Sequence, residues 1–249
     1  MRRFYIAPQE SGTSPLTITG PDAHHIARVL RLTAGDTIEL FDGRGMNYTA
    51  VIKGISTDGV TVSISNSRAA ASESILHLAI GVGMLKGNKL DKLIPPLSEL
   101  GVAELLPFYS KRTIPASRAG QLQNRMARWQ KIGIESLKQC RRSRTMDIHL
   151  PGEFADTLNI AETYQYKMLF WEDRRDTADK LQPLPGVKPG SVFLLLGPEG
   201  GFDSAEVDAA RRSGFMVASL GPRILKAETA VITACALAQY VFGDMGNNT

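Results

Sequence analysis

Two glycine–proline loops near the end of this 249-residue sequence carry the residue types best suited to holding a small molecule. The first, GPEGG at 197–201, follows the apolar run 192–196 and places one carboxylate, Glu199, among three glycines. Glycine lets the backbone approach a ligand closely, and open α/β sheets bind ligands at the carboxyl ends of their strands. The second loop, 220–225, comes one helix and one strand later. We expect both loops to line one pocket.

Alternating strands and helices from residue 75 onward supply the framework for these loops. Branched apolar runs predict buried strands at 75–80, 102–108, 167–171, 192–196 and 215–220, with helices at 89–100, 121–142, 203–214 and 230–242. Asp203 and Glu206 have the spacing of a capping box, whereas Pro95 and Pro96 must start, kink or break their helix. This order is typical of an α/β domain with a mostly parallel sheet.

The helix at 230–242 is apolar nearly all round and therefore has to be buried. In a chain of this size, we expect the surplus apolar surface to form a subunit interface. The segment contains Thr233 and Gln239 and is too short to span a bilayer. Arg2 and Arg3 lead into a segment without the apolar core of a signal peptide. A soluble, cytoplasmic protein is the expectation.

Residues 1 to about 70 have a different pattern, that of short strands and turns. Strands are predicted at 3–7, 16–19, 37–41, 49–55 and 60–64, with Asp-Gly turns after the third and fourth. They indicate a small antiparallel barrel or sandwich, interrupted by one helix that Asp22 can cap. A small, polar linker is expected at 65–74, which divides the chain into domains at 1–70 and 71–249.

Arginines recur in the first domain and again after the long helix. The formal net charge of +4 permits a nucleic-acid partner without requiring one. The candidates for phosphate contacts are Arg2, Arg3, Arg28, Arg31, Arg141, Arg142 and Arg144. The alternative is an ordinary solvated surface, on which the cluster at 141–144 only complements the dipole of the preceding helix.

Metal and dinucleotide sites are not expected. Cys140 and Cys235 lie far apart and predict reduced thiols, and the four histidines have no partner at zinc spacing. The glycines between Gly81 and Gly87 superficially match a dinucleotide-binding loop, but the last one comes one residue too late. A nucleotide-dependent oxidoreductase therefore fails on spacing.

At the two glycine–proline loops, the sequence resembles the RsmE family, which are ribosomal RNA uridine-N3 methyltransferases of the SPOUT superfamily. GPEGGF at 197–202 and LGPRILKAETA at 220–230 carry the resemblance. The segment 24–45 is similar to the PUA-like N-terminal barrel of this family, and ELGV at 99–102 and the run 139–144 also match. Pro95 and Pro96 stand where the family usually has a Gln-Lys pair.

The resemblance implies a methyl donor, S-adenosylmethionine, and a substrate, the 16S ribosomal RNA of the 30S subunit. It also implies a deep trefoil knot in the C-terminal domain and a homodimer. Backbone groups of the two loops would hold the adenine and ribose of the donor, with Ile224 and Leu225 as an apolar wall. The implied donor-site residues are Leu196, Gly197, Gly200, Leu220, Gly221, Pro222, Arg223, Ile224, Leu225 and Thr229.

Methyl transfer to N3 of uracil requires that the N3 proton be removed or the resulting anion stabilised, and that donor and base be aligned. Glu199 and Glu228 are the candidate bases, and Arg223 is the candidate cation facing negative charge on O2 or O4. The alternative is that the glutamates cap neighbouring helices and that Arg223 pairs with one of them. We expect the target uridine to be flipped out of its surroundings to reach the site.

Two rival functions remain open. One is another SPOUT activity, 2′-O-methylation of ribose, although the paired loops favour methylation of a base. The other is a non-catalytic RNA-binding or ribosome-assembly factor, which would not bind S-adenosylmethionine tightly.

Overall fold

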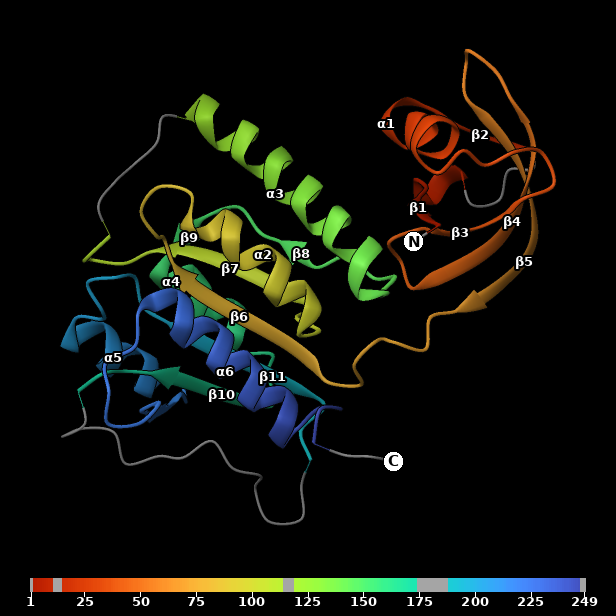
Figure 1. Ribbon diagram of the computed structural model, residues 1–249. Coiled ribbons are helices and arrows are strands. Elements are labelled where there is room, and N and C mark those ends of the chain that lie inside the picture. Colours follow the sequence, from red (N-terminus) through yellow and green to blue (C-terminus); the bar gives the residue numbers. More distant parts are fainter. Residues whose placement is uncertain (1, 11–14, 114–118, 174–187, 247–249) are drawn as a thin grey trace. The chain divides into compact units, whose positions relative to one another are not determined.

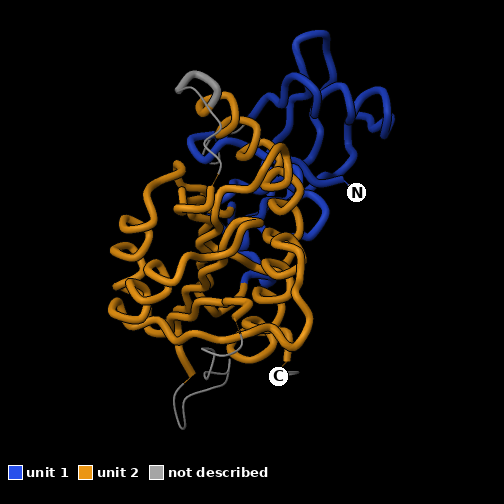
Figure 2. Tube along the Cα trace, turned by 90° about the vertical axis from the view of Figure 1, so that its left-hand side faces the viewer, with its two compact units in different colours: residues 1–73, 134–145 blue, residues 74–133, 146–249 orange. Residues whose placement is uncertain are grey.

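The computed structural model of the chain describes residues 2–10, 15–113, 119–173 and 188–246 (Figure 1). It divides into two compact units, of which the first comprises residues 1–73 and 134–145 and the second comprises residues 74–133 and 146–249 (Figure 2). The long helix α3, Ala119–Cys140, contributes its first part to the second unit and its last part to the first. Residues 134–145 thus return to the unit that the first 73 residues begin.

The second unit is built on a seven-stranded sheet. Its strands are β6 (His77–Gly83), β7 (Glu104–Tyr109), β8 (Asp147–Ile148), β9 (Gly152–Glu153), β10 (Tyr166–Phe170), β11 (Ser191–Leu196) and β12 (Met216–Ala218). They lie in the order β12-β10-β11-β6-β7-β8, with β9 also paired to β7, and each recorded pairing is parallel. The predicted α/β class with a parallel sheet is confirmed.

Helices cover both faces of this sheet, because successive strand side chains point to opposite faces and both sets are apolar. On one face, Leu78 and Ile80 of β6 pack in a cluster with residues of α2 (Lys89–Glu99) and α6 (Ala227–Val241). On the other face, Phe193 and Leu195 of β11 pack with residues of α4 (Phe154–Ala161) and α5 (Ser204–Arg212). Figure 1 shows α6 running across β6 and β11.

Parallel pairing fixes where the loops emerge. The segments that follow β6, β7, β10, β11 and β12 all leave from the carboxyl edge of the sheet, because their strands run the same way. Both glycine–proline loops are among them. The fold therefore gathers residues distant in sequence at one edge, as the strand-end argument predicts.

Two helix signals had different outcomes. The capping box of α5 is present: the Asp203 side chain accepts from the backbone N–H of Ala205, and Glu206 accepts from the N–H of Asp203. In α2, by contrast, Pro95 and Pro96 lie inside the helix and neither starts nor ends it. Leu93, Ile94 and Leu97 are fully buried around them, and this packing holds the helix despite the two missing N–H donors.

Helix α6 is only partly buried. Val231, Ala234 and Ala238 lie in the core, but Ile232, Leu237 and Tyr240 are 37%, 40% and 63% exposed. The described residues of one subunit thus leave an apolar face of this helix uncovered, and the predicted burial of the whole helix requires the subunit interface expected from the sequence.

The first unit is a five-stranded sheet in the order β1-β3-β4-β5-β2, made of β1 (Arg3–Tyr5), β2 (Leu16–Ile18), β3 (Thr37–Phe41), β4 (Met46–Ile55) and β5 (Val60–Ala69). It is antiparallel except for the pairing of β1 with β3. The predicted linker at 65–74 is wrong for its first half, because β5 continues to Ala69 against the start of β4. Polar residues belong there because this part of the strand is exposed.

The helical insertion of this unit also differs from the prediction. It consists of α1 (Gly20–His24) and a π-helical turn, η2 (His25–Val29), after the short helix η1 (Pro8–Glu10). The N-cap is Thr19, and Asp22 lies in the first turn, where its carboxylate accepts from Lys138 at 2.8 Å. Asp22, which the sequence assigned to capping, therefore binds Lys138, a residue distant in the sequence, instead of capping the helix.

The predicted combination of a small N-terminal β domain with a larger α/β domain agrees with this architecture. The trefoil knot remains what the resemblance implies, because strand order does not report how the chain is threaded.

Candidate active site

A cavity of about 620 Å³ opens at the carboxyl edge of the second unit's sheet. This volume falls within the range of small-molecule sites. Both glycine–proline loops line it, together with the residues that follow β10 and the start of α6. Of the residues that the sequence assigned to the donor, the lining includes Leu196, Gly197, Gly200, Leu220, Gly221, Pro222, Arg223, Ile224 and Leu225. Thr229 is exposed on α6 and lies outside the lining.

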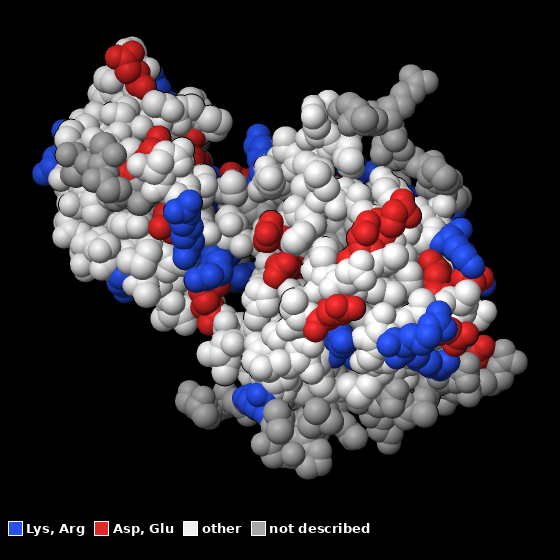
Figure 3. Space-filling model, turned by 180° about the vertical axis from the view of Figure 1, so that it is seen from behind, with Lys and Arg blue, Asp and Glu red and all other residues white. Residues whose placement is uncertain are grey.

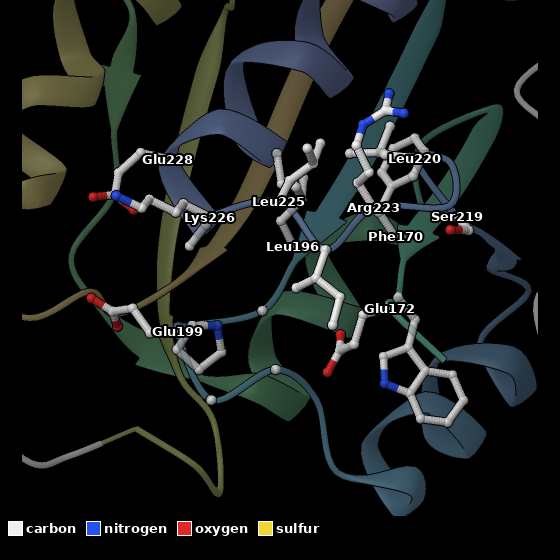
Figure 4. A pocket seen from close by; sticks show the side chains of 18 of the residues that line it. Phe170, Glu172, Leu196, Glu199, Ser219, Leu220, Arg223, Leu225, Lys226 and Glu228 are labelled. Atoms are coloured by element: carbon white, nitrogen blue, oxygen red, sulfur yellow. The ribbon is translucent and has the colours of Figure 1, made fainter. Parts of the chain in front are cut away.

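Apolar side chains form the inner wall of this cavity. Phe170 and Leu196 end two neighbouring strands and are buried, and Leu220 and Leu225 are half-buried beside them (Figure 4). Ile224 is 84% exposed although it belongs to the lining. A large apolar side chain held open beside buried ones suits contact with a flat, partly apolar ligand.

The loop backbones have conformations that require glycine. Gly201 and Gly221 have φ values of 68° and 107°, which L side chains rarely adopt. A Cβ added at Gly201 would collide with the carboxylate of Glu172, whereas one at Gly221 would meet no atom within 4 Å. Gly201 is therefore required because the Glu172 carboxylate lies too close for a side chain, whereas Gly221 is required only by its backbone conformation.

Lys89 joins the two candidate bases. Its Nζ lies 3.0 Å from Oε1 of Glu199 and 3.2 Å from Oε1 of Glu228. The three side chains come from the start of α2, the loop after β11 and the first turn of α6. Figure 4 shows Glu199 and Glu228 on the same side of the cavity. Neither glutamate caps a helix and neither pairs with Arg223, so the alternative roles considered from the sequence are not observed among the described residues.

The two glutamates differ in their other partners and in the burial of their second oxygen. Oε1 of Glu199 also accepts from the backbone N–H of Lys86 at 3.1 Å. Burial raises the pKa of Glu199, but Lys89 and the backbone donors outweigh it and the net pKa is lowered. Glu199 and Glu228 in turn raise the pKa of Lys89. Oε2 of Glu228 is buried and has no hydrogen-bond partner among the described residues.

Arg223 is exposed at the tip of the second loop. Within the described part of the chain its guanidinium has no recorded ion pair or hydrogen bond, and Figure 4 shows it extending away from the two glutamates. With respect to the described residues, all its donors are therefore free to meet an incoming acceptor.

Lys89 and Glu172 line the cavity but were not among the predicted site residues. Glu172 directly follows the residues at the end of β10, so the strand-end rule could have found it. Lys89 had no comparable signal, because its contacts depend on how α2 is placed against loops more than 100 residues later in the sequence.

The arginines assigned to RNA all belong to the first unit, and the structure separates them into two groups. Arg3 and Arg142 are 2% and 4% exposed. Arg3 donates to the carbonyls of Leu137 and Arg142 at 2.8 Å, and Nε of Arg142 lies 3.1 Å from Glu73. Arg3 and Arg142 are therefore buried and bonded within the unit and do not face solvent. The exposed group is Arg2, Arg28, Arg31, Arg141 and Arg144.

On the face shown in Figure 3, basic and acidic side chains alternate in small groups. Any attraction for RNA on this face therefore comes from particular cations rather than from one large field.

Packing explains the glycines that superficially match a dinucleotide loop. Gly81 and Gly83 lie within β6, where an added Cβ would collide with Leu195 and Pro198 respectively. Among the described residues, no group of His, Cys, Asp and Glu is arranged to hold a metal ion. In the described parts of the chain, no helix has the length and hydropathy needed to cross a membrane.

Comparison with protein families matches both units. Residues 72–239 match the family model described as an RNA methyltransferase domain, and residues 18–65 match an RNA methyltransferase PUA domain. The ribosomal RNA small subunit methyltransferase E of Bacillus subtilis is 28% identical over 252 residues, which cover 96% of each chain. That of Buchnera aphidicola subsp. Schizaphis graminum is 29% identical and covers 98% of this chain and 97% of its own.

Two solved structures are similar over nearly the full length. The ribosomal RNA small subunit methyltransferase E of Neisseria gonorrhoeae, bound to S-adenosyl methionine, has a TM-score of 0.84 and 30% identity, covering 98% of this chain and 99% of its own. A putative methyltransferase of Legionella pneumophila in complex with SAM has the same TM-score and coverage at 28% identity.

Proposed function

Because the chain belongs to the RsmE family of RNA methyltransferases, we propose that it transfers a methyl group from S-adenosylmethionine to N3 of a specific uridine in the 16S ribosomal RNA of the small subunit. The observation that carries this proposal is the cavity that the two glycine–proline loops form at the carboxyl edge of the sheet.

The cavity suits such a donor in three ways. Its volume of about 620 Å³ is large enough for a small molecule of this size. Its apolar wall of Phe170, Leu196 and Ile224 suits an adenine ring, and its glycines leave backbone groups accessible for polar contacts. Three carboxylates, Glu172, Glu199 and Glu228, line the same cavity and suit a ligand that carries positive charge. The residues present therefore fit the donor without a metal ion.

When bound, S-adenosylmethionine supplies an electrophilic methyl group on a positively charged sulfur. The chain itself has to hold the uracil in line, accept the N3 proton and stabilise the charge left on the ring. Glu228 is the better candidate for the base, because its Oε2 is buried and has no hydrogen-bond partner among the described residues. Glu199 is already bonded to Lys89 and to a backbone N–H, and its lowered pKa makes it a weak proton acceptor.

Arg223 is proposed as the cation that faces the negative charge developing on O2 or O4. It lies on the loop that lines the cavity, is exposed and has free donors within the described residues. A guanidinium fixed where charge develops acts mainly in the transition state. Lys89 is proposed as a positioning residue that pairs with both carboxylates and fixes them relative to the cavity.

RNA binding is proposed for the first domain, residues 1–70, together with residues 134–145 of the same compact unit, and catalysis for the remainder of residues 71–249. The exposed arginines of the first unit would contact phosphates, while Arg3 and Arg142 would support that surface from inside. The protein would act in the cytoplasm, where its ribosomal substrate is located.

A homodimer is also proposed. The exposed apolar residues Ile232, Leu237 and Tyr240 on α6 are the surface that a second copy would cover. Replacing Leu237 by Asp should shift the molar mass measured by light scattering from dimer to monomer. A wild-type protein that is monomeric at micromolar concentration would contradict this assembly.

The activity is tested by incubating the purified protein with labelled S-adenosylmethionine and either undermethylated 30S subunits or naked 16S ribosomal RNA. We expect label in the RNA, mapped by mass spectrometry of nucleosides to N3-methyluridine at one position. Label on a ribose 2′-oxygen would replace the proposal with the rival methyltransferase activity. RNA binding without donor binding would indicate a non-catalytic factor.

A further inference from the structure

Four cations stand beside the cavity but outside its lining, on segments that follow β6 and β7. They are Lys86, Lys111, Arg112 and Arg125, called the rim cations below. The first three are exposed and Arg125 is half-buried. All four belong to the second unit, whereas the arginines that the sequence assigned to RNA belong to the first.

Hydrogen bonds connect the rim cations to the first glycine–proline loop. Nη1 of Arg112 donates to the carbonyl of Gly200 at 3.0 Å, and the backbone N–H of Lys86 donates to Glu199 at 3.1 Å. Nη2 of Arg125 donates to the carbonyl of Gly87, the residue after Lys86, at 2.6 Å. The contacts therefore run without a break from α3, across the loop after β6 and the cavity loop, to the loop after β7.

The loop that carries Lys111 and Arg112 is held firmly by the capping box of α5. Glu206, which is 5% exposed, accepts from the hydroxyl of Ser110 at 3.3 Å and from the backbone N–H of Lys111 at 3.0 Å. The N–H of Thr113 closes a turn on the carbonyl of Ser110 at 2.9 Å. The backbone is thus fixed while the charged ends of the two side chains reach solvent.

The charged ends have donors to spare. A guanidinium carries five N–H donors, and Arg112 and Arg125 each have one recorded hydrogen bond among the described residues. Lys111 lies 3.4 Å from Asp203 with 63% of its side chain exposed, and an exposed pair of this kind is worth little and exchanges readily with another anion. The nearby Glu199 is already paired with Lys89.

We infer that the rim cations bind the phosphates that flank the target nucleotide, on the strand that crosses this edge when one base enters the cavity. The inference rests on the proposed function. Arginine forks match phosphate oxygens in pairs, and lysine adds a mobile charge. Nη1 of Arg112 donates to Gly200 and the backbone N–H of Lys86 donates to Glu199, so two of the cations that would hold phosphates are attached to the loop that lines the cavity.

The test compares two variants with the same net charge. In the first, the four rim cations are changed to Gln. In the second, four exposed cations elsewhere in the same unit are changed to Gln: Lys131, Lys188, Arg211 and Arg212. Affinity for 16S ribosomal RNA is measured by filter binding across a salt series, together with kcat and KM for methylation and the Kd of S-adenosylmethionine.

We expect the rim variant to lower the slope of log affinity against log salt by about 3, since each lost phosphate contact on a single strand removes about 0.7. The KM for RNA should rise at least ~10-fold at low salt, with donor affinity unchanged, and the control variant should behave as wild type. A third variant, Arg112→Lys with Arg125→Lys, keeps the charge and should keep the slope. If Arg112 and Arg125 only support the fold, this Lys variant will lose RNA affinity as the Gln variant does.

A rim variant with the salt slope of the control protein would overturn the inference even if methylation proceeds normally. In another outcome, the rim variant has a lower slope of log affinity against log salt than the wild-type protein, but the wild-type protein never methylates RNA. The proposed function then fails and the rim inference stands. The two failures are therefore distinguishable.

Discussion

The two edges of the seven-stranded sheet each carry a polar cluster organised around carboxylates, but the clusters differ in what they leave unbonded. At the carboxyl edge, Lys89 is shared between Glu199 and Glu228 beside an open cavity. At the amino edge, Glu104 at the start of β7 is surrounded by His77, His149 and Tyr164.

In the amino-edge cluster, both carboxylate oxygens of Glu104 are hydrogen-bonded by other members of the cluster. The hydroxyl of Tyr164 donates to Glu104 at 2.7 Å, and Nε2 of His77 and of His149 lie 2.7 and 2.9 Å from its oxygens. The hydrogen bond with His149, followed by those with Tyr164 and His77, outweighs burial and lowers the pKa of Glu104 to about 2. The same carboxylate raises the pKa of His149.

The comparison shows that a perturbed pKa does not by itself identify a site of chemistry. The pKa of Glu104 is strongly lowered, yet both its oxygens are hydrogen-bonded and the residue lies outside the cavity lining. Glu228 keeps a buried oxygen without a partner among the described residues, and it lines the cavity. We therefore expect changes at the carboxyl edge to affect turnover and changes at the amino edge to affect stability.

The largest effect is expected for Glu228→Gln, which removes the proposed base while keeping the shape of the side chain. Turnover should fall by about 10²- to 10⁴-fold, the usual contribution of a positioned general base, with donor affinity unchanged. Glu162→Gln, an exposed position after α4, serves as the control. Normal turnover by the Glu228 variant would remove this residue from the mechanism and return attention to Glu199.

Arg223→Ala should follow, with a loss of about 10²- to 10³-fold in kcat, because a donor that faces developing charge acts mainly in the transition state. Binding of S-adenosylmethionine, measured by calorimetry, should be retained. Arg223→Lys should recover part of the rate by restoring the charge without the fork geometry. Unchanged methylation of 30S subunits by the alanine variant would exclude the role.

Glu104→Gln should leave turnover unchanged but lower the free energy of unfolding by about 1–3 kcal/mol, since the buried hydroxyl of Tyr164 and the half-buried His149 lose a charged acceptor. Because the pKa of Glu104 falls from 4.5 to about 2 on folding, its contribution is present above pH 4.5 and disappears as the pH falls toward 2. Because the pKa of His149 is raised from 6.5, its contribution is complete below pH 6.5 and disappears as the pH rises through the folded value.

Chemical unfolding of both proteins from pH 2 to 9 tests this window. The difference between wild type and variant should be greatest between about pH 4.5 and 6.5 and should shrink on either side. A constant difference would mean that packing rather than ionisation links these side chains, and a loss of turnover in the folded variant would break the contrast between the two edges.

The smallest effect is expected for Asp203→Ala at the carboxyl edge. This change removes half of the capping box of α5 and should lower the midpoint of thermal unfolding by about 2–4 °C, with donor affinity unchanged. Asp203 lies at the carboxyl edge of the sheet but outside the cavity lining, so turnover should be unchanged. If kcat falls as far as in the Glu228 variant, a position near the cavity is enough to affect turnover, and the Glu228 result no longer identifies a base.

Local signals were sufficient for much of the fold and for the backbone of the site. The apolar run 192–196 predicted a buried strand, the Asp203–Glu206 spacing predicted a capping box, and the two glycine–proline loops predicted one pocket; each is observed. These features depend on residues close together in the sequence, where propensity and spacing act directly.

Features that depend on distant partners were not predictable in this way. Lys89 meets its two glutamates only because α2 packs beside α6, and Arg3 is buried only because residues 137–143 provide acceptors for it. From the sequence alone, an arginine at position 3 reads as a solvated charge. The continuity of α2 through Pro95 and Pro96 likewise follows from tertiary packing that outweighs local preference.

The buried Arg3 also has a consequence for the order in which the protein is made. Its guanidinium is bonded to the carbonyls of Leu137 and Arg142, so the first unit includes residues 134–145 as well as 1–73. During synthesis, β1 leaves the ribosome long before the last turns of α3 exist. The first unit therefore begins to be translated first but is completed only after more than half of the chain has emerged. A nascent chain cut before residue 137 would leave Arg3 without the acceptors at those carbonyls.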